Sequence, residues 1–408
     1  RRQYCVVFEA RIGGVIYYFI DNQYYFKRKG LYGHYDDAER FAFFSRAVLE
    51  MLPYIDFHPD VINCNDWQTA MVPVYYNAFY ANNDWYKGIK TVFTIHNIQY
   101  QGKYGPELLE DVLGIPQNQT SILEYDGCVN MMKGAIETAN RVTTVSPTYA
   151  QEIMDPWFSH GMDGILRQRS WKISGILNGI DVVSYDPATD KDIYAPFTVE
   201  DLSGKAVNKA ELQKRLNLEE KPDIPLIGMV TRMVSHKGLD LVKETLDQLM
   251  WENDIQFVIL GSGDYEYETF FRQMQDKYPG RLCACFGFVP ELSRKIYAGA
   301  DIFLMPSKSE PCGLSQMIAL RYGTIPVVRE TGGLKDSIQD SGDGCGNGFT
   351  FQSYNGGDML YAIHRSLEGY ANHEGWEVLV KRAMQCDNSW GHSANAYIRM
   401  YRELIKEE

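Results

Sequence analysis

The second half of the chain carries two cations and one carboxylate in turns that follow apolar runs. Arg232 and Lys237 come after Ile224–Val230, and Glu310 comes after Asp301–Met305. An arginine can bind a diphosphate bidentately and a lysine acts as a point charge, so the cations favour a diphosphate site; solvated surface cations are the alternative. A carboxylate at Glu310 can bind a sugar hydroxyl or stabilise positive charge at an anomeric carbon, or it can be an ordinary helix N-terminal acid.

Two glycine-containing turns follow other apolar runs. Thr331-Gly332-Gly333 precedes a predicted short helix, Leu334–Ile338, where backbone N–H groups can approach an anion; a plain turn is an equally good interpretation. Gly261-Ser262-Gly263 resembles half of a dinucleotide fingerprint but lacks the third glycine and the acidic residue that follow in that motif. The sequence therefore does not favour a NAD site.

In the first half, polar side chains also follow apolar runs. His96 and Asn97 come after Lys90–Ile95, and Asp66 comes just after Val61–Cys64. His96 and Asn97 can point out of the end of a strand into a cleft, although a lone histidine is more often structural. Asp66 can equally be an ordinary helix cap.

The elements that must position these residues alternate from Asp60 onward: short β-branched runs, turns and amphipathic stretches. This pattern is typical of βα units on a parallel sheet, in which ligands bind beyond the carboxyl ends of the strands. The predicted strands are Val61–Cys64, Lys90–Ile95, Val142–Ser146, Ile224–Val230, Ile255–Leu260, Arg281–Phe286, Asp301–Met305, Ile325–Val328 and Gly348–Phe351. The predicted helices include Asp37–Leu52, Trp67–Ala81, Leu239–Met250 and Ser393–Ile405, and Cys5–Glu9 with Val15–Asp21 is predicted to form a hairpin.

Length and composition limit the class of protein. At about 150 to 200 residues a domain, the 408 residues predict two or three domains. The 53 acidic against 40 basic side chains give a net charge of −13, which argues against nucleic-acid and anionic-membrane partners, and no apolar run reaches the roughly 18 residues of a membrane span. The eight cysteines have no metal-type spacing, so we expect no metal and a reducing, cytoplasmic location.

The Asp-, Pro- and Thr-rich stretch Asp186–Ala206 is predicted to link the two halves. We therefore expect a first domain over residues 1–185, a second over 186–390, and a C-terminal helix over 391–408 that packs back on the first domain. The chain opens at Arg1 without a methionine or a signal peptide, so we expect it to be N-terminally incomplete.

Seven segments carry a more specific pattern. They are Asn65–Ala70, Thr94–Asn97 with Tyr100–Gly102, Val145–Ala150, Leu177–Asp181, Thr231-Arg232 with His236–Asp240, Pro306-Ser307 with Glu310–Leu314, and Arg329–Leu334. In this order and spacing they resemble the bacterial glycogen synthases and plant starch synthases. These are retaining glucosyltransferases with the α/β GT-B fold, in which two Rossmann-like domains face each other across a cleft.

The resemblance implies transfer of glucose from ADP-glucose to the non-reducing end of an α-1,4-glucan such as glycogen or starch, without a cofactor or a metal. It implies that Arg232 and Lys237 bind the donor diphosphate, that Glu310 is the essential carboxylate beside the glucose, and that His96 contacts the glucose from the first domain. The residues implied in substrate binding are Asp66, Asn97, Asn178, Gly261, Phe288, Cys312, Gly313, Leu314, Thr331, Gly332 and Gly333. Among them, Phe288 would stack on the nucleobase.

We do not find the family's N-terminal Lys-Thr-Gly-Gly-Leu loop in this chain. At least one strand–loop–helix unit of the family's first domain is also not found. We therefore expect the activity of this chain to be impaired. Ile318 stands where many related transferases have a second glutamate, which favours the glycogen and starch synthases over relatives with other donors. The alternatives are another nucleotide-sugar transferase of the same fold and a catalytically impaired glucan-binding fragment.

Overall fold

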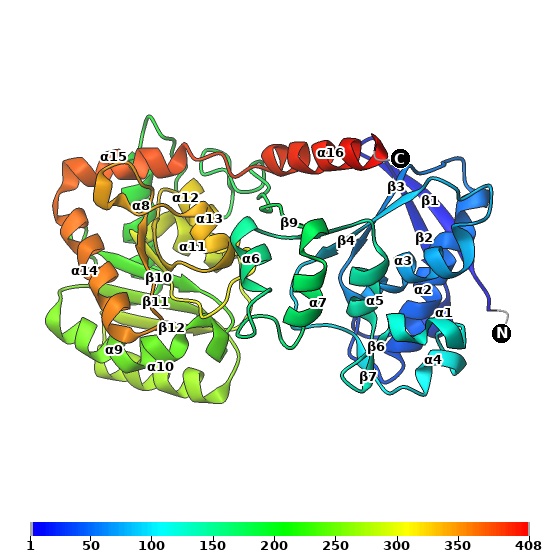
Figure 1. The fold of residues 1–408 in the computed structure, drawn as a ribbon. Coiled ribbons are helices and arrows are strands. Elements are labelled where there is room, and N and C mark those ends of the chain that lie inside the picture. Colours follow the sequence, from blue (N-terminus) through cyan, green and yellow to red (C-terminus); the bar gives the residue numbers. More distant parts are fainter. Residues whose placement is uncertain (1–2, 407–408) are drawn as a thin grey trace. The chain divides into compact units, whose positions relative to one another are not determined.

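The computed structural model describes residues 3–406, and the chain divides into two compact units. Unit 1 comprises the residues up to Val145, Ala150–Ile176 and those from Tyr397 on. Unit 2 comprises Ser146–Tyr149 and Leu177–Ala396. Each unit contains a parallel β-sheet with helices on it (Figure 1), so the predicted α/β class is confirmed.

Unit 2 is built on a sheet of six parallel strands in the order β12-β11-β10-β13-β14-β15. The strands are β10 (Leu226–Val230), β11 (Gln256–Gly261), β12 (Leu282–Phe286), β13 (Ile302–Met305), β14 (Ile325–Arg329) and β15 (Phe349–Phe351). All six were predicted, with ends that differ by at most two residues, because continuous apolar runs are typical of strands buried on both faces. The chain adds strands outward from β10 in one direction and then, from β13, in the other. The order therefore reverses between β10 and β13.

Helices cover both faces of this sheet, with α9 and α10 on one face and α8, α11 and α12 on the other (Figure 1). The helices of unit 2 are α8 (Ser203–Arg215), α9 (Leu239–Glu252), α10 (Tyr265–Lys277), α11 (Pro290–Gly299), α12 (Ser315–Arg321), α13 (Gly332–Ser337), α14 (Gly356–Ala371) and α15 (His373–Met384). The amphipathic period predicted α9 correctly. Its apolar residues are buried, including Leu239, Val242 and Leu246.

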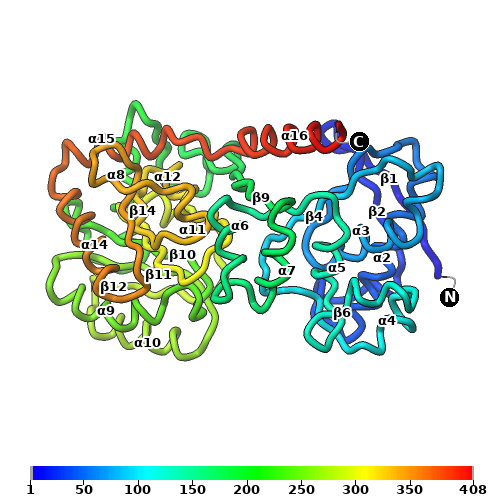
Figure 2. The backbone as a smooth tube through the Cα atoms, in the orientation of Figure 1, coloured from blue at the N-terminus to red at the C-terminus, as the bar shows by residue number. Residues whose placement is uncertain are grey.

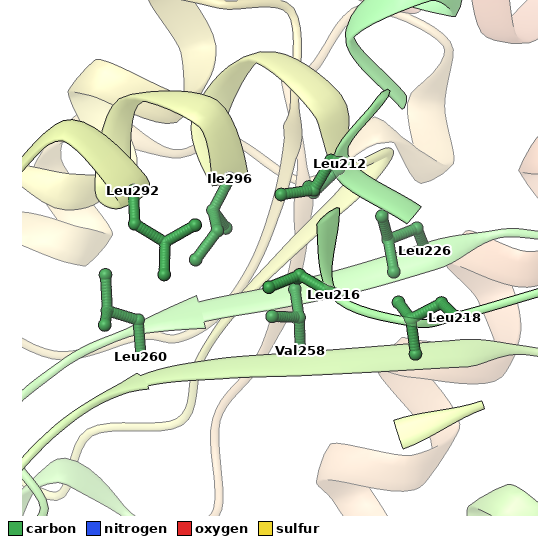
Figure 3. Close-up of a cluster of buried hydrophobic side chains, with 9 residues drawn as sticks. Leu212, Leu216, Leu218, Leu226, Val258, Leu260, Leu292 and Ile296 are labelled. Carbon is green, nitrogen blue, oxygen red and sulfur yellow. The ribbon is translucent and has the colours of Figure 1, made fainter. Parts of the chain in front are cut away.

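One buried apolar cluster joins α8 and α11 to the sheet (Figure 3). Leu212 and Leu216 of α8 and Ile296 of α11 pack together with Leu226 of β10 and Val258 of β11. Full burial of each such side chain stabilises the fold by about 2 kcal/mol, before the cost in conformational entropy. The cluster thereby anchors the strands whose carboxyl ends carry the candidate residues.

Unit 1 contains a second, four-stranded parallel sheet in the order β3-β4-β8-β9. The strands are β3 (Val61–Asn65), β4 (Lys90–Ile95), β8 (Arg141–Thr144) and β9 (Ile173–Gly175). The predicted hairpin also forms, as β1 (Val6–Ile12) and β2 (Val15–Asp21), and β5 (Lys103–Tyr104), β7 (Cys128–Asn130) and β6 (Glu124–Tyr125) make a small sheet that was not predicted. The helices of this part are α1 (Gln23–Phe26), α2 (Asp37–Met51), α3 (Met71–Tyr75), α4 (Leu108–Asp111), α5 (Met131–Thr138), α6 (Pro147–Glu152) and α7 (Asp163–Gln168).

The predicted helix over Trp67–Ala81 is not a continuous α-helix. A 3₁₀ turn at Trp67–Thr69 leads into α3, and a π-helical stretch follows at Tyr76–Tyr80. The whole of α3 is buried, so its sequence is apolar on every side. Periodicity cannot distinguish the three kinds of helix in such a segment.

The division between the units differs from the predicted boundary at residues 185 and 186. Residues 177–206 all belong to unit 2. The backbone N–H of Ile180 donates to Asn388 O at 2.8 Å, and Arg294 Nη1 of α11 donates to Ser184 O at 2.6 Å and to Asp190 Oδ2 at 2.9 Å. These bonds attach the segment to unit 2.

The last helix, α16 (Trp390–Lys406), is the terminal red segment of the tube in Figure 2. Residues up to Ala396 group with unit 2, and residues from Tyr397 on group with unit 1. Among residues 3–406, no helix combines the length and the apolar character that crossing a membrane requires.

Candidate active site

The strand order of unit 2 reverses between β10 and β13, and open α/β sheets bind ligands beyond the carboxyl ends of the strands at such a reversal. The loops that follow these two strands lie against each other. The backbone N–H of Lys308 donates to the carbonyl oxygen of His236 at 2.9 Å. The sheet thus brings together two loops in which the sequence analysis had separately predicted site residues.

Lys237 and Glu310 form an ion pair between these loops. Lys237 Nζ lies 2.6 Å from Glu310 Oε2 and 2.9 Å from Oε1, and Ser307 Oγ donates to Oε2 at 2.9 Å. Glu310 is only 6% exposed, and the Lys237 side chain is 17% exposed. A buried carboxylate needs such partners, because an unpaired charge in this position would be costly.

Arg232 adds a second positive charge to the loop after β10. Its side chain is exposed, and its guanidinium has no hydrogen-bond or ion-pair partner in the described part of the chain. Burial, with the positive charges of Lys237 and Arg232, lowers the pKa of His236 below its usual value. His236 was not predicted as a site residue. Its position in the sequence, between Arg232 and Lys237, was the only indication that it belongs to the site.

The turn Thr331-Gly332-Gly333 supports the loop that carries Glu310. A Cβ atom on Gly332 would lie 2.0 Å from Glu310 O, and one on Gly333 would lie 2.0 Å from Cys312 O. Helix α13 begins at Gly332, two residues before the predicted start, and the N–H of Gly333 donates to Glu310 O at 3.1 Å. In this structure the Gly333 amide is therefore bonded to the protein, and the two glycines permit the close packing of the loop on α13.

Gln316 of α12 holds the other side of the loop. Its Nε2 lies 3.1 Å from Cys312 O and 3.0 Å from Gly313 O. Burial raises the pKa of the Cys312 thiol to about 12, opposed by a hydrogen bond from the backbone of Asn178. Cys312 is therefore a thiol rather than a nucleophilic thiolate near neutral pH. Leu314, two residues later in the same loop, is exposed.

Gly261 and Phe288 lie in the loops after β11 and β12. A Cβ atom on Gly261 would be 1.8 Å from Thr231 O, so this glycine permits close approach to the loop that carries Arg232. The N–H of Gly287 donates to Gly261 O at 2.9 Å. The next residue, Phe288, is 92% exposed, so its ring is available for stacking.

The candidate residues of the first half gather at the carboxyl end of β4 in unit 1. Asp66 Oδ1 accepts the backbone N–H of His96 at 2.8 Å, and His96 Nε2 lies 2.9 Å from Asn65 Oδ1. Burial raises the pKa of Asp66, opposed by the N–H groups of His96 and Asn97 and by the positive charge of His96. Asp66 itself has a φ of 58°, which is uncommon for a residue other than glycine, and its side-chain bond to the His96 N–H ties the loops after β3 and β4 together.

A groove of about 460 Å³ adjoins this turn in unit 1. Trp67, Tyr100 and Tyr104 line it together with polar groups such as Gln99. Trp67 is buried against Gly102 and Phe41, whereas Tyr100 is 52% exposed, so Tyr100 is the ring that can stack on a sugar. No group of three or more His, Cys, Asp or Glu side chains that could hold a metal is found in residues 3–406.

Family models cover most of the chain. Residues 1–168 match the starch synthase catalytic domain, and residues 208–377 match the glycosyl transferases group 1. Glycogen synthases of Geobacillus thermodenitrificans and Bacillus cereus are 52% and 50% identical to the chain, over 412 and 410 residues. The alignments cover all of this chain and 85% and 86% of those proteins.

Solved structures agree with this family. The catalytic domain of starch synthase IV from Arabidopsis thaliana, bound to ADP and acarbose, has a TM-score of 0.89 and 38% identity over 99% of this chain and 85% of that chain. Sucrose-phosphate synthase from Thermosynechococcus elongatus has a TM-score of 0.58 at 17% identity over 93% of this chain and 81% of its own, a likeness of fold alone. The chain therefore belongs to the glycogen synthase and starch synthase family, retaining glucosyltransferases with the GT-B fold of two Rossmann-like domains.

Proposed function

We propose that the chain transfers glucose from ADP-glucose to the non-reducing end of an α-1,4-glucan, with retention of configuration. The observation that carries the proposal is the buried Lys237–Glu310 pair at the reversal of strand order in unit 2. The starch synthase IV structure, which contains ADP and acarbose and is 38% identical to this chain, supports the choice of nucleotide and glucan.

The two cations, Arg232 and Lys237, stabilise the leaving group. Arg232 binds the diphosphate through its unengaged guanidinium, and Lys237 adds a point charge. As the bond to the anomeric carbon breaks, negative charge grows on the departing ADP. Preorganised cations that meet this growing charge lower the barrier more than they stabilise the bound donor.

Glu310 acts on the transferred glucose. Its carboxylate is held by Lys237 and Ser307, so it has a fixed position from which to accept a glucose hydroxyl or to stabilise the oxocarbenium-like carbon. The glucan hydroxyl attacks on the face that ADP leaves, so configuration is retained in a same-face substitution. Cys312 does not act as the nucleophile, because its thiol is protonated near neutral pH.

Unit 1 contributes the acceptor groups. The family resemblance assigns His96 and Asn97, held by Asp66, to sugar binding, and the groove beside Tyr100 binds glucan rings. These assignments rest on the resemblance to the family together with the aromatic lining of the groove. Orientation of the acceptor hydroxyl supplies a further part of the rate.

The test is the release of ADP from ADP-glucose with glycogen as acceptor. Glu310→Gln and Lys237→Ala should each lower kcat by roughly 100-fold or more. Lys243→Ala is the matched control, because Lys243 lies on α9, which follows the same loop, and forms only an exposed ion pair with Glu266 of α10. The assay compares this chain with a version that carries the family's N-terminal loop restored, because the loop is expected to be needed for turnover. If both bind glycogen and neither releases ADP, the transferase proposal fails and a glucan-binding function replaces it.

A further inference from the structure

Cys283 and Cys285 form a close pair of thiols outside the site described above. They occupy alternate positions of β12, so both side chains point to the same face of the sheet. Their Sγ atoms are 3.8 Å apart. Both are free and half-buried, and no third Cys, His, Asp or Glu joins them within residues 3–406.

The pair lies on an edge strand, and the side chain of Gln275 on α10 accepts the N–H of Ala284 between the two cysteines at 2.8 Å. Both cysteines pack against the apolar cluster of α8, α11 and the sheet shown in Figure 3. Cys283 pairs with Val258 and Cys285 pairs with Leu260, both on β11. Strand β12 is the edge of the described sheet, so neighbouring strands hold it on one side only.

We propose that Cys283 and Cys285 are a redox-active dithiol, which closes to an intrachain disulfide by exchange with a low-molecular-weight disulfide and reopens with thiols. In the first step the Cys285 thiolate attacks a sulfur of glutathione disulfide and releases one glutathione thiolate. In the second, Cys283 loses its proton to solvent, attacks Cys285 Sγ and releases the second glutathione thiolate. The protein loses two hydrogen atoms, and the small disulfide is reduced to two thiols.

The electrostatics of the pair assign these roles. The hydrogen bond between the two thiols, in which either sulfur can be the donor, lowers the pKa of Cys285 against the effect of burial, and only Cys285 has in addition the positive charge of Arg215, which acts in the same direction. The same hydrogen bond, together with burial, raises the pKa of Cys283. Since the thiolate is the attacking species, Cys285 reacts first.

The geometry makes the disulfide reversible. Alternate residues of a strand have Cα atoms about 6.6 Å apart, close to the upper limit of roughly 6.8 Å for a disulfide. Closing the bond also requires the sulfurs to move from 3.8 Å to about 2.05 Å. A bond strained in this way has a high reduction potential and is readily reduced, as labile disulfides are.

Oxidation would be transmitted to the loop after β12. Cys285 is two residues from Gly287, whose N–H donates to Gly261 O, and Phe288 follows. Contraction of β12 shifts these residues and weakens ADP binding. This consequence rests on the proposed function, whereas formation of the disulfide does not.

The experiment titrates the reduced, full chain with glutathione disulfide and maps the product by mass spectrometry. Trypsin cuts after Arg281 and Arg294, so both cysteines lie in one peptide, residues 282–294. We expect this peptide to lose two hydrogen atoms and its reactivity toward iodoacetamide, and to regain both with dithiothreitol. Cys283→Ser should trap one glutathione on Cys285, and the control Cys345→Ser, at an exposed cysteine, should leave the disulfide unchanged.

The proposal is overturned if residues 282–294 stay fully alkylated under conditions that glutathionylate Cys345. It is also overturned if Cys283→Ser leaves Cys285 unmodified. Calorimetry then measures ADP affinity, which we expect to fall several-fold on oxidation in the native chain and to stay constant in Cys285→Ser. Unchanged affinity in the oxidised chain refutes the coupling to the loop, and failure of the reduced chain to bind ADP counts against the proposed function while the mass measurement still decides the dithiol.

Discussion

Lys237 and Glu310 are 73 residues apart in the sequence, yet the lysine ammonium contacts both oxygens of the glutamate side chain. The pair joins the loops of the two strands between which the sheet reverses its order. In the proposed function, a diphosphate that binds Lys237 competes with Glu310 for the N–H groups of the lysine ammonium. In this structure the ion pair neutralises both charges, and the bond from Ser307 also holds the carboxylate in place.

The pairing predicts a specific stability pattern. Lys237→Ala leaves the buried Glu310 carboxylate without its cation, so we expect the free energy of unfolding to fall by about 2 kcal/mol. The double variant Lys237→Ala/Glu310→Gln should recover most of this loss without recovering transfer, because the amide needs no counter-ion. Urea denaturation of both variants checks this, and a double variant less stable than Lys237→Ala alone would refute the coupling.

Because α13 packs closely on the loop that carries Glu310, we expect a single added methyl group at Gly333 to lower kcat strongly. Gly333→Ala would place a Cβ 2.0 Å from Cys312 O, so the loop must move. We expect kcat to fall by about 10- to 100-fold, since small displacements of catalytic groups have effects of this size.

The control for that variant is Gly344→Ala. Gly344 has a φ of 77° with open space around it, so alanine there strains the backbone by about 1 kcal/mol without contacting the site. Equal losses of activity in the two variants, after matching for thermal stability, would show that the contact with Cys312 has no catalytic importance.

The sequence predicted the sheets well, because their strands are continuous apolar runs bounded by polar turns. Strand β4 has the predicted limits, Lys90–Ile95. The unit boundary could not be predicted in the same way, because it depends on bonds such as Ile180 N to Asn388 O between residues far apart in the chain. Local composition at Asp186–Ala206 indicated a linker, whereas Arg294 attaches its start to unit 2.

The sequence predicted which residues belong to the candidate site better than it predicted the residues that bind and support them. Arg232, Lys237 and Glu310 follow strands that the sheet places side by side, so topology explains why the loops that carry them are neighbours. The bond from Ser307 to Glu310 and the support from Gln316 depend on loop geometry, which carries no periodic signal. The glycines of α13 were expected to offer amides to phosphate, and the structure shows in addition a packing role that spacing alone does not indicate.

Asp340, three residues after α13, predicts an acid-dependent loss of stability. Its two oxygens accept Arg365 Nη1 at 2.7 Å and Nη2 at 2.9 Å, and also the N–H groups of Thr350 and Gly342. Burial acts to raise the pKa of Asp340, but Arg365 and these amides hold it at about 2. The carboxylate therefore stabilises the fold above the ordinary pKa of an aspartate, and this stabilisation is lost as the pH falls through about 2.

We expect Asp340→Asn to lower the free energy of unfolding by about 1 kcal/mol at pH 7, a figure reduced for solvent screening, and the difference to shrink between about pH 4 and pH 2. Asp276→Asn is the control, because Asp276 is exposed on α10 and has no side-chain partner in the described chain. Urea denaturation across this pH range measures both. A difference independent of pH would show that the charge of Asp340 is not what stabilises the native chain.

Phe288 predicts a change in donor affinity without a change in stability. Its ring is 92% exposed, so Phe288→Ala removes little buried area and should leave the melting temperature unchanged. Stacking of one base on an aromatic ring contributes about 1 to 3 kcal/mol, so we expect KM for ADP-glucose to rise about tenfold with kcat nearly constant, and Phe288→Tyr to retain the native value. Tyr265→Ala is the matched control, because Tyr265 is 84% exposed in the same unit and belongs to α10. If both alanine variants raise KM equally, or neither does, Phe288 does not hold the nucleobase, and the loop after β12 has no part in donor recognition.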